Sequence, residues 1–323
     1  MSEDKVPAKP SLLQLPLSRA AIDRAGHLRT DSEKLSQMWT NARILHFSAG
    51  KFRTIASSTE QIALDFLTPA QVKELTASDS FEFGERFFLG VDGEQPYFAW
   101  CGDCPDIEIF PQYLTLRELG AFLPDLENGL AVHTQALANW HHKHQRCPQC
   151  GGITVSAAGG SVRKCLVDES EHYPRNDPAI IVLIKDDRDR ILLGRQKVWP
   201  ENRFSTFAGF VEPGESFEQC VIREVQEEAG VIASEIYYLG SQPWPFPASL
   251  MIAFQAVTTN PQDARPDGEE IEEIRWYSRD GMRDAIHRQE LLLPPSISVA
   301  RKMIEAWYGV NHQRDLRGGQ AWR

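Results

Sequence analysis

Positive charge is scarce in this sequence. Its 323 residues include 34 lysines and arginines against 45 aspartates and glutamates, which gives a formal net charge of −11. Broad, non-specific binding to nucleic acid needs clustered cations that displace counterions, so this balance argues against it. An anionic substrate must then be met by local positive charge: metal ions, arginines or backbone amides.

Long apolar runs are missing as well. The longest aliphatic run, 179–184, is closed by Lys185 and falls far short of the roughly 20 apolar residues of a membrane helix. Residues 1–5 are polar and contain no apolar stretch of the kind that a signal peptide requires. The six cysteines include two Cys-x-x-Cys pairs, which in a large cytosolic chain favour metal binding or free thiols over disulfides. We therefore expect a cytoplasmic protein.

The length predicts two or three domains. Short apolar runs broken by Gly and Pro over 42–100 favour strands, and leucines at helical spacing over 114–140 predict a helix. Beyond residue 174, apolar strand patterns alternate with helical ones, which indicates an α/β (α+β) sandwich. We expect a polar leader (1–35), a β-rich N-terminal domain with a linking helix (36–143), a cysteine-bearing module (144–173), the sandwich domain (174–310) and a tail (311–323).

The segment 216–229 is predicted to be a helix that gathers acidic side chains. Ser216 with Gln219 three residues later is a capping-box start, and a glycine at 230 is a natural stop. Glu224, Glu227 and Glu228 stand at i, i+3 and i+4, so their carboxylates converge on one face. Such a face is either simply solvated or a site for a hard divalent cation, Mg²⁺ or Mn²⁺, which relieves the repulsion. A glutamate that is not fully engaged as a ligand can act as a base toward water.

The wider segment resembles the Nudix box. Gly209, five residues, Glu215, seven residues, and then Arg-Glu-Val-x-Glu-Glu-x-Gly-Val over 223–231 match that box at every defined position. The resemblance implies a three-layer α/β/α fold and hydrolysis of a nucleoside diphosphate linked to another moiety. It assigns 174–310 to the Nudix hydrolase domain and implies the chemistry of phosphoryl transfer with a metal ion.

The same resemblance implies roles by position. Glu224 and Glu228 resemble the principal metal ligands, and Glu227 resembles a shared ligand or catalytic base. Arg223 is expected to orient the glutamates by ion pairing, with Glu215 as a partner. Two further metal contacts are implied, the main-chain carbonyl of Ala208 and the carboxylate of Glu270, although an exposed acidic loop is an alternative for the second.

A proline-rich segment lies ten residues after the box. Residues 241–249 read Ser-Gln-Pro-Trp-Pro-Phe-Pro-Ala-Ser, and because alternating prolines cannot lie inside a paired strand, we expect a rigid extended segment. Displayed Trp and Phe rings suit stacking on a flat ring, and Gln and Ser can read polar edges; a packing loop between strands is the alternative. At this distance after a Nudix box, the segment resembles the hallmark of NADH pyrophosphatases of the NudC type.

That resemblance implies an NADH/NAD pyrophosphatase that cuts a nicotinamide dinucleotide, preferably reduced, to nicotinamide mononucleotide and AMP. It also implies a homodimer. Arg117 is a candidate phosphate contact from the N-terminal domain, or an ordinary surface arginine. The other residues that we assign to substrate binding by matching position are Tyr173, Phe210, Gln242, Pro243, Trp244, Pro245, Phe246, Pro247, Ala248, Ser249, Met251 and Ala300.

The cysteine-bearing module has the spacing of a zinc ribbon. Cys147-Pro-Gln-Cys150 is followed after fourteen residues by Cys165. The resembled family usually has a fourth cysteine three residues later, where this chain has Asp168. We expect a structural Zn²⁺ held by three thiolates and Asp168, with His172 as a rival ligand. The second pair, Cys101 and Cys104, has no partner pair at ribbon spacing, and we interpret it as a turn with incidental thiols.

Two other functions remain open from the sequence. The first is removal of NAD caps from RNA 5′ ends, which cuts the same bond in a larger substrate; zinc ribbons and aromatic loops can help to hold RNA. The second is a catalytically silent Nudix module that binds a dinucleotide or RNA. The intact glutamates and Arg223 argue against the second function.

Overall fold

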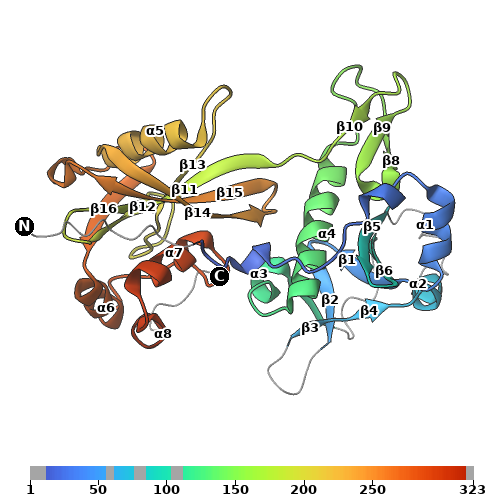
Figure 1. The fold of residues 1–323 in the computed structure, drawn as a ribbon, viewed down its shortest axis with the longest axis horizontal. Helices are drawn as coiled ribbons and strands as arrows, with labels where there is room; N and C mark the ends of the chain where they lie inside the picture. The colour runs from blue at the N-terminus through green and yellow to red at the C-terminus, as the bar shows by residue number, and fades with distance from the viewer. Residues whose placement is uncertain (1–11, 56–61, 76–84, 103–111, 318–323) are drawn as a thin grey trace, which may run out of the picture. The chain divides into compact units, whose positions relative to one another are not determined.

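The computed structural model describes residues 12–55, 62–75, 85–102 and 112–317 (Figure 1). The chain divides into two compact units. Unit 1 comprises Met1–Pro16, Asp177–Gln242 and Ser249–Arg323, and unit 2 comprises Leu17–Asn176 and Pro243–Ala248. None of the helices in the described ranges combines the length and the apolar character needed to cross a membrane.

Unit 1 is built on a six-stranded sheet in the order β14-β15-β11-β12-β16, with β13 paired to β11. β11 runs parallel to β15 and antiparallel to β12 and β13. The elements are β11 (Asp177–Lys185), β12 (Ile191–Gln196), β13 (Phe207–Phe210), α5 (Phe217–Ala229), β14 (Ala233–Trp244), β15 (Ser249–Thr258), a 3-10 turn η4 (Pro261–Asp263), β16 (Ile271–Tyr277), α6 (Arg279–His287), α7 (Val299–Tyr308) and α8 (His312–Asp315).

Alternation along β11 divides unit 1 into three layers. Ile180 and Val182 lie in a buried cluster with the apolar side of α5, whereas Ile181 and Leu183 lie in a second cluster with α6 and α7. Successive side chains of a strand point to opposite faces, so the sheet has helices on both sides (Figure 1). The expected α/β/α sandwich is confirmed. Leu15 also belongs to the cluster on the α7 side, and Leu13 donates its N–H to Leu239 O.

Unit 2 contains a seven-stranded sheet in the order β3-β2-β1-β6-β5, with β4 paired to β1 and β7 to β2. A separate three-stranded sheet, β10-β9-β8, carries the cysteine-bearing module. The elements are η1 (Pro16–Ser18), η2 (Gly26–Leu28), α1 (Ser32–Trp39), β1 (Arg43–Ser48), β2 (Lys51–Ile55), β3 (Ala63–Leu64), β4 (Phe66–Leu67), α2 (Pro69–Leu75), β5 (Glu85–Asp92), β6 (Gln95–Cys101), β7 (Gln112–Thr115), α3 (Leu116–Leu119), α4 (Asp125–Lys143), β8 (Thr154–Ala157), η3 (Ala158–Gly160), β9 (Val162–Cys165) and β10 (Glu171–His172).

The helix predicted over 114–140 is two helices, α3 and α4. Pro124 stands at the N-cap of α4 with φ −56° and ψ 157°. Proline disfavours the α conformation in the residue before it, so a continuous helix cannot pass this point. α4 then runs for 19 residues and buries Leu130, Leu137 and Trp140.

The prediction of an extended, unpaired segment over 241–249 is wrong. β14 continues through Pro243 to Trp244, residues 245–248 form a turn, and β15 begins at Ser249. Proline is tolerated here because β14 is an edge strand of its sheet, where a missing N–H costs no ladder hydrogen bond. The proline-rich segment is therefore the tip of a hairpin, and its residues 243–248 belong to unit 2.

Candidate active site and metal centres

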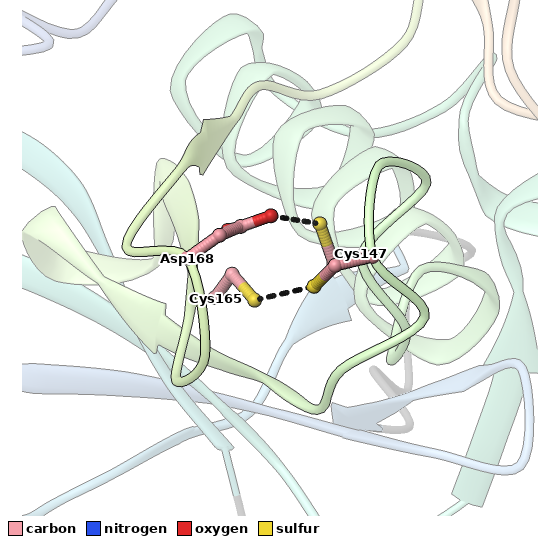
Figure 2. A group of neighbouring side chains, drawn as sticks. Cys147, Cys165 and Asp168 are labelled. Atoms are coloured by element: carbon pink, nitrogen blue, oxygen red, sulfur yellow. Dashed lines mark hydrogen bonds between the residues drawn. The ribbon is translucent and has the colours of Figure 1, made fainter.

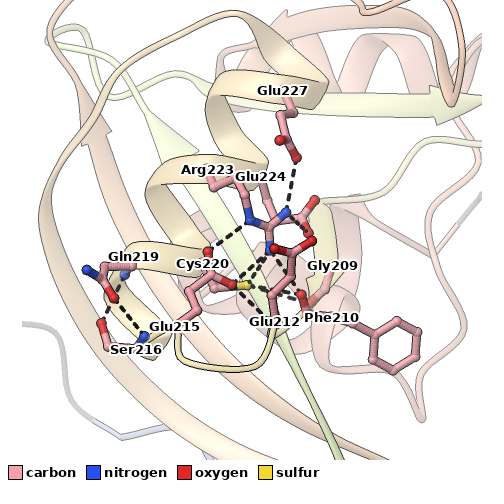
Figure 3. Close-up of polar contacts among 10 residues, drawn as sticks. All are labelled: Gly209, Phe210, Glu212, Glu215, Ser216, Gln219, Cys220, Arg223, Glu224 and Glu227. Carbon is pink, nitrogen blue, oxygen red and sulfur yellow. Dashed lines mark hydrogen bonds and ion pairs between the residues drawn. The ribbon is translucent and has the colours of Figure 1, made fainter.

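The acidic helix α5 begins and ends on the residues that the sequence marks. The Ser216 hydroxyl accepts from the N–H of Gln219 at 3.2 Å, and the Gln219 side chain accepts from the N–H of Ser216 at 2.9 Å, which completes the predicted capping box (Figure 3). Gly230 ends the helix in the left-handed conformation, φ 67°. Val221 and Val225 turn into the core, whereas the side chain of Glu227 is 59% exposed.

Arg223 is the centre of the polar network on α5 (Figure 3). Its guanidinium forms a two-pronged ion pair with Glu215, at 2.8 and 2.9 Å. It also donates to Glu224 at 2.7 Å, to Glu227 at 3.0 Å and to the carbonyl of Phe210 at 3.0 Å. The side-chain hydrogen bonds of Arg223 are the largest cause that lowers the pKa of Glu215, to about 2. One rigid, permanently charged group thus fixes two of the clustered carboxylates.

Glu224 lies directly against the backbone of β13. A Cβ added at Gly209 would stand 1.8 Å from Glu224 Oε1 and 1.9 Å from its carboxyl carbon, so any other residue at this position would displace that carboxylate. The side chain of Glu224 is 12% exposed. Burial is the largest cause that raises the pKa of Glu224. The glycine of the box therefore makes room for a carboxylate.

Glu228 is the most buried of the three glutamates, with 4% of the residue exposed. Burial, and then the charges of Glu270, Glu224 and Asp267, raise the pKa of Glu228 to about 8. The backbone of Ala208 donates a hydrogen bond to this carboxyl group, whereas Oε2 has no hydrogen-bond partner within the described residues. An oxygen that is buried and unpartnered among other carboxylates fits a ligand of a divalent cation.

Asp267, which the sequence analysis did not single out, organises the loop that carries Glu270. Its carboxylate accepts from the backbone N–H groups of Glu269 at 3.2 Å, Glu270 at 3.3 Å and Ile271 at 2.8 Å. Glu270 itself accepts from the side chain of Gln196 at 2.7 Å. The negative charge of Glu270 helps to raise the pKa of Glu228, so the structure brings Glu270 near the helical glutamates. An Asp that caps a turn has a recognisable signature, but here it stands in an acidic stretch that hides it.

Three predicted substrate residues gather on the α7 side of the unit 1 sheet. In the strand register, Ala179 of β11 is paired with Phe210 of β13 and with Met251 of β15, and residues that are opposite one another share a face. Ala300 is buried on α7, in the same cluster that Met251 packs against. Phe210 is 61% exposed. Glu224 and this group therefore lie on opposite faces of the sheet, because successive residues of β13 alternate.

Gln242 is fully buried and positions the hairpin. Its amide donates to the carbonyl of Ile297 at 3.0 Å, which ties the end of β14 to the residues before α7. Ser249 begins β15, paired with Asp177. These contacts support the hairpin from within unit 1, so Gln242 has a structural partner beside any contact with a substrate.

The hairpin tip is held by two helices of unit 2. Asn139 of α4 donates to the carbonyls of Pro245 at 2.9 Å and Pro247 at 3.0 Å. The guanidinium of Arg117, on α3, lies 3.9 Å from the ring centroid of Phe246, which meets the ring of Trp244 edge-on at 4.9 Å. Ala248 completes the turn. The predicted aromatics and Arg117 therefore form one contact group, in which the rings meet edge-on and the arginine lies against both of them.

The last predicted substrate residue, Tyr173, comes directly after β10 in the cysteine-bearing module. It is 65% exposed, and its hydroxyl donates to Glu171 at 2.9 Å. The ring is therefore available to a ligand while its hydroxyl has a local partner. The hydrogen bond to Glu171 is also the largest cause that raises the pKa of Tyr173.

The four predicted zinc ligands converge. The ligand atoms of Cys147, Cys150, Cys165 and Asp168 all lie within 4.8 Å of one another; Cys147 Sγ lies 3.4 Å from Asp168 Oδ2, and the other two sulfurs lie 3.5 Å apart (Figure 2). Three thiols and a carboxylate fit a closed tetrahedral Zn²⁺ site. The hydroxyl of Ser170 is the largest cause that lowers the pKa of Asp168.

The rival ligand, His172, is outside this group of ligand atoms. Its Nε2 instead forms a hydrogen bond with the Ser170 hydroxyl at 3.1 Å, and the same hydroxyl donates to Asp168 at 2.5 Å. The geometry thus favours Asp168 over His172 as the fourth ligand. Of the second cysteine pair, Cys101 ends β6 as a free thiol, and Cys104 lies outside the described residues.

Known proteins match this chain in sequence. Residues 175–294 match the family model described as NUDIX domain. A Mycobacterium bovis protein named NAD-capped RNA hydrolase NudC is 37% identical over 300 residues, which cover 90% of this chain and 94% of that protein; the Mycobacterium tuberculosis protein of that name is 36% identical over the same shares. Homo sapiens NAD-capped RNA hydrolase NUDT12 is 37% identical over 201 residues, 58% of this chain and 43% of that protein. The crystal structure of a NUDIX hydrolase from Nitrosomonas europaea is 20% identical with a TM-score of 0.41, over 55% of this chain and 96% of that one.

The family match and the box geometry of α5 define a Nudix domain, most of which lies in unit 1. The matches to relatives at 36–37% identity cover 94% of those proteins and 90% of this chain, so they include residues of both units. The chain therefore belongs to the NudC-type family of Nudix hydrolases, as the sequence motifs predicted.

Proposed function

We propose that this Nudix hydrolase is a metal-dependent NAD(H) diphosphatase, which hydrolyses the dinucleotide to nicotinamide mononucleotide and AMP. The observation that carries the proposal is the buried Glu228 carboxylate beside Glu224 and Glu270, whose Oε2 has no hydrogen-bond partner among the described residues. The relatives are named as hydrolases of NAD-capped RNA, which supports NAD as the linked group.

The residues that would hold Mg²⁺ or Mn²⁺ are Glu224, Glu228, Glu270 and the carbonyl of Ala208. When bound there, the cation would neutralise charge on the diphosphate and lower the pKa of a coordinated water. The pKa values of Glu224 and Glu228 are raised, because burial and the repulsion between neighbouring carboxylates disfavour their charged forms. A bound cation would offset the free-energy cost of burying these carboxylates and of their mutual repulsion, so this set of oxygen ligands fits a divalent cation.

Glu227 is the residue that we assign as the base. Its side chain is 59% exposed, against 12% for Glu224, and Arg223 holds one of its oxygens at 3.0 Å. An exposed but oriented carboxylate can accept the proton of the attacking water. The oxygen of the water bonds to one phosphorus while the bond from that phosphorus to the bridging oxygen breaks. Both products, nicotinamide mononucleotide and AMP, are then phosphomonoesters.

The hairpin tip is proposed to select the nicotinamide half. Trp244 and Phe246 are already stacked with Arg117, and Asn139 fixes the turn that carries them. A preformed aromatic group loses little conformational entropy when a flat ring binds to it. Phe210, Met251, Ala300 and Tyr173 are proposed as further contacts. The homodimer implied by the family is also a proposal, which light scattering of the purified protein tests.

Removal of the NAD cap from RNA is the second candidate function, favoured by the names of the relatives. The two functions share one cleaved bond and differ in whether an RNA strand is attached to the adenosine. A comparison of kcat/KM for NADH, NAD⁺, ADP-ribose and NAD-capped RNA separates them. A higher kcat/KM for NADH than for capped RNA supports the proposed function. A higher kcat/KM for capped RNA supports cap removal in its place.

Glutamine variants test the chemistry. Glu227→Gln and Glu228→Gln should each lower kcat on NADH with Mg²⁺ by roughly 10²–10⁴-fold, the usual worth of a base or of charge stabilisation. Glu218→Gln, an exposed position in the first turn of the same helix, is the matched control and should retain full activity. Undiminished turnover by Glu227→Gln or Glu228→Gln would contradict the mechanism. A wild type that turns over neither NADH nor NAD-capped RNA would instead favour the catalytically silent module.

A further inference from the structure

Unit 2 contains a cavity of about 560 Å³ that the proposed chemistry does not use. Its polar lining comes from three segments that are distant in the sequence: the β1–β2 hairpin with Ser48, the start of β5 with Glu85, and the last turn of α4 with Lys143. The end of β6, with Cys101, also lines it. The volume is in the range of roughly 300–1,000 Å³ that is typical of small-molecule sites.

The lining of the cavity combines a donor, an anion and a cation. Ser48 is 4% exposed, and its hydroxyl has no hydrogen-bond partner within the described part of the chain. Glu85 is 38% exposed at its side chain, and its Oε1 accepts from Arg163 at 3.1 Å. Lys143 and His142 are exposed at the end of α4, and Lys143 has no ion-pair partner among the described residues. A buried hydroxyl without a partner is costly unless a ligand satisfies it.

His141 also lines the cavity but adds no cation. Its Nδ1 accepts from Arg163 at 2.7 Å and its Nε2 donates to the carbonyl of Gly160 at 2.7 Å. Burial is the largest cause that lowers the pKa of His141, so the ring stays neutral. The positive charge at the cavity therefore comes from Lys143.

These groups exclude the simpler classes of ligand. One carboxylate among the lining residues is too few for a divalent cation, which takes several oxygen ligands. A lone phosphate would leave most of the volume empty and would be repelled by Glu85. An apolar molecule would bury the Ser48 hydroxyl and the Lys143 ammonium group without partners. A nucleotide unit suits the polar groups of the cavity, with phosphate for the Lys143 cation, ribose hydroxyls for Ser48, and N–H groups for the Glu85 carboxylate beside its bond from Arg163.

We propose that this cavity binds a nucleotide unit with a 5′ phosphate, either a free nucleotide or a nucleotide of an RNA strand. The cavity also touches the hairpin tip, because Asn139 and Pro247 are among its lining residues and Asn139 donates to the carbonyls of the turn. If the tip selects substrate as proposed above, occupancy of the cavity tunes that selection, and this second part rests on the proposed function.

Binding to the metal-free protein in EDTA tests the site directly. AMP and a short 5′-phosphorylated RNA are titrated by calorimetry into the wild type and three variants. Lys143→Ala removes the cation, Ala138→Leu fills the cavity from α4, and Ser48→Ala removes the unpartnered hydroxyl. Lys34→Ala, an exposed lysine of α1, is the matched control.

Lys143→Ala should weaken binding about tenfold, which is 1.4 kcal/mol, and Ala138→Leu should weaken it at least as much. Ser48→Ala should weaken binding while the melting temperature stays level or rises, because the hydroxyl has no partner to lose. If Ser48 had a purely structural role, Ser48→Ala would lower the melting temperature and leave binding unchanged. AMP binding alone assigns the site to free nucleotides, and RNA binding alone assigns it to a strand; both support the proposal.

No saturable binding of either probe, or binding that is equal in the wild type, Lys143→Ala and Ala138→Leu, overturns the proposal. The coupling is tested separately: AMP should change KM for NADH more in the wild type than in Ala138→Leu, and equal changes refute the coupling. Because calorimetry requires no turnover, nucleotide binding by a protein that does not cleave NADH would reject the proposed function and leave the cavity site standing.

Discussion

Replacing Gly209 with alanine should inactivate the enzyme without unfolding it. The added Cβ would stand 1.8 Å from Glu224 Oε1, whereas ordinary van der Waals contact begins at 3.4 Å. The carboxylate must therefore retreat by roughly 1.6 Å, which exceeds the tolerance of about 0.5 Å for productive geometry. The obstructed atoms are the far end of a flexible side chain, so the strand β13 itself does not have to move.

The magnitude of the expected loss is set by that displacement. A misplacement of about 1 Å in a catalytic group can cost about 100-fold in rate, which corresponds to about 2.7 kcal/mol of transition-state stabilisation. Stability should change by less than about 1 kcal/mol, because alanine lowers the entropy of the unfolded chain and offsets part of any local strain. The variant should therefore have at most about 1% of the wild-type kcat/KM and an almost unchanged melting temperature.

The assay is NADH hydrolysis with saturating Mg²⁺, alongside thermal unfolding. Gly26→Ala is the control, because a Cβ there meets nothing within 4 Å. A double-mutant cycle isolates the cause: in a Glu224→Ala background, Gly209→Ala should cost nothing further. Full activity of Gly209→Ala would show that Glu224 need not lie against β13, and a fresh loss in the Glu224→Ala background would show that the glycine acts elsewhere.

Three further tests address separate parts of the structure. Burial and like charges raise the pKa of Glu228 from 4.5 to about 8, so in EDTA the wild type loses stability as the pH rises through that window. At pH 8, urea unfolding should show Glu228→Gln to be more stable than the wild type by about 2–5 kcal/mol, whereas at pH 4 it should show no such gain. Equal stability of the two proteins at pH 8 would refute the cost of burying the charged Glu228 carboxylate. Elemental analysis should find about one zinc per chain in the wild type and in His172→Ala but much less in Asp168→Ala, and the opposite pattern would make His172 the ligand. Trp244→Ala should reduce hydrolysis of NADH more than that of ADP-ribose, which lacks nicotinamide; equal losses would remove the stacking role.

Local signals in the sequence were sufficient for α5 and for the zinc ligands. The capping box at Ser216 and Gln219 and the glycine at 230 are short-range patterns, and they set the helix boundaries that the structure has. The spacing of the cysteines likewise predicted a metal-binding module, and the resembled family's fourth ligand position pointed to Asp168 with His172 as a rival; the ligand atoms of the three cysteines and Asp168 converge. In both cases the pattern lies within a short stretch of sequence.

Other features depend on contacts that a linear pattern does not contain. The alternating prolines excluded a paired strand only if β14 were central, and its place at the edge of the sheet depends on the whole topology. Asp267 is one acid among several, and only its hydrogen bonds to the loop N–H groups distinguish it. The cavity of unit 2 joins Ser48, Glu85 and Lys143 from three separate elements, so no local motif marks it.

The most direct test of the central claim is identification of the products from NADH. The wild-type protein, incubated with NADH and Mg²⁺ and analysed by mass spectrometry, should yield AMP and reduced nicotinamide mononucleotide in equal amounts, and neither product in EDTA. Release of nicotinamide or adenosine, equal cleavage in EDTA, or intact NADH would contradict the assignment of Glu224, Glu227 and Glu228 to metal-dependent cleavage of the dinucleotide diphosphate.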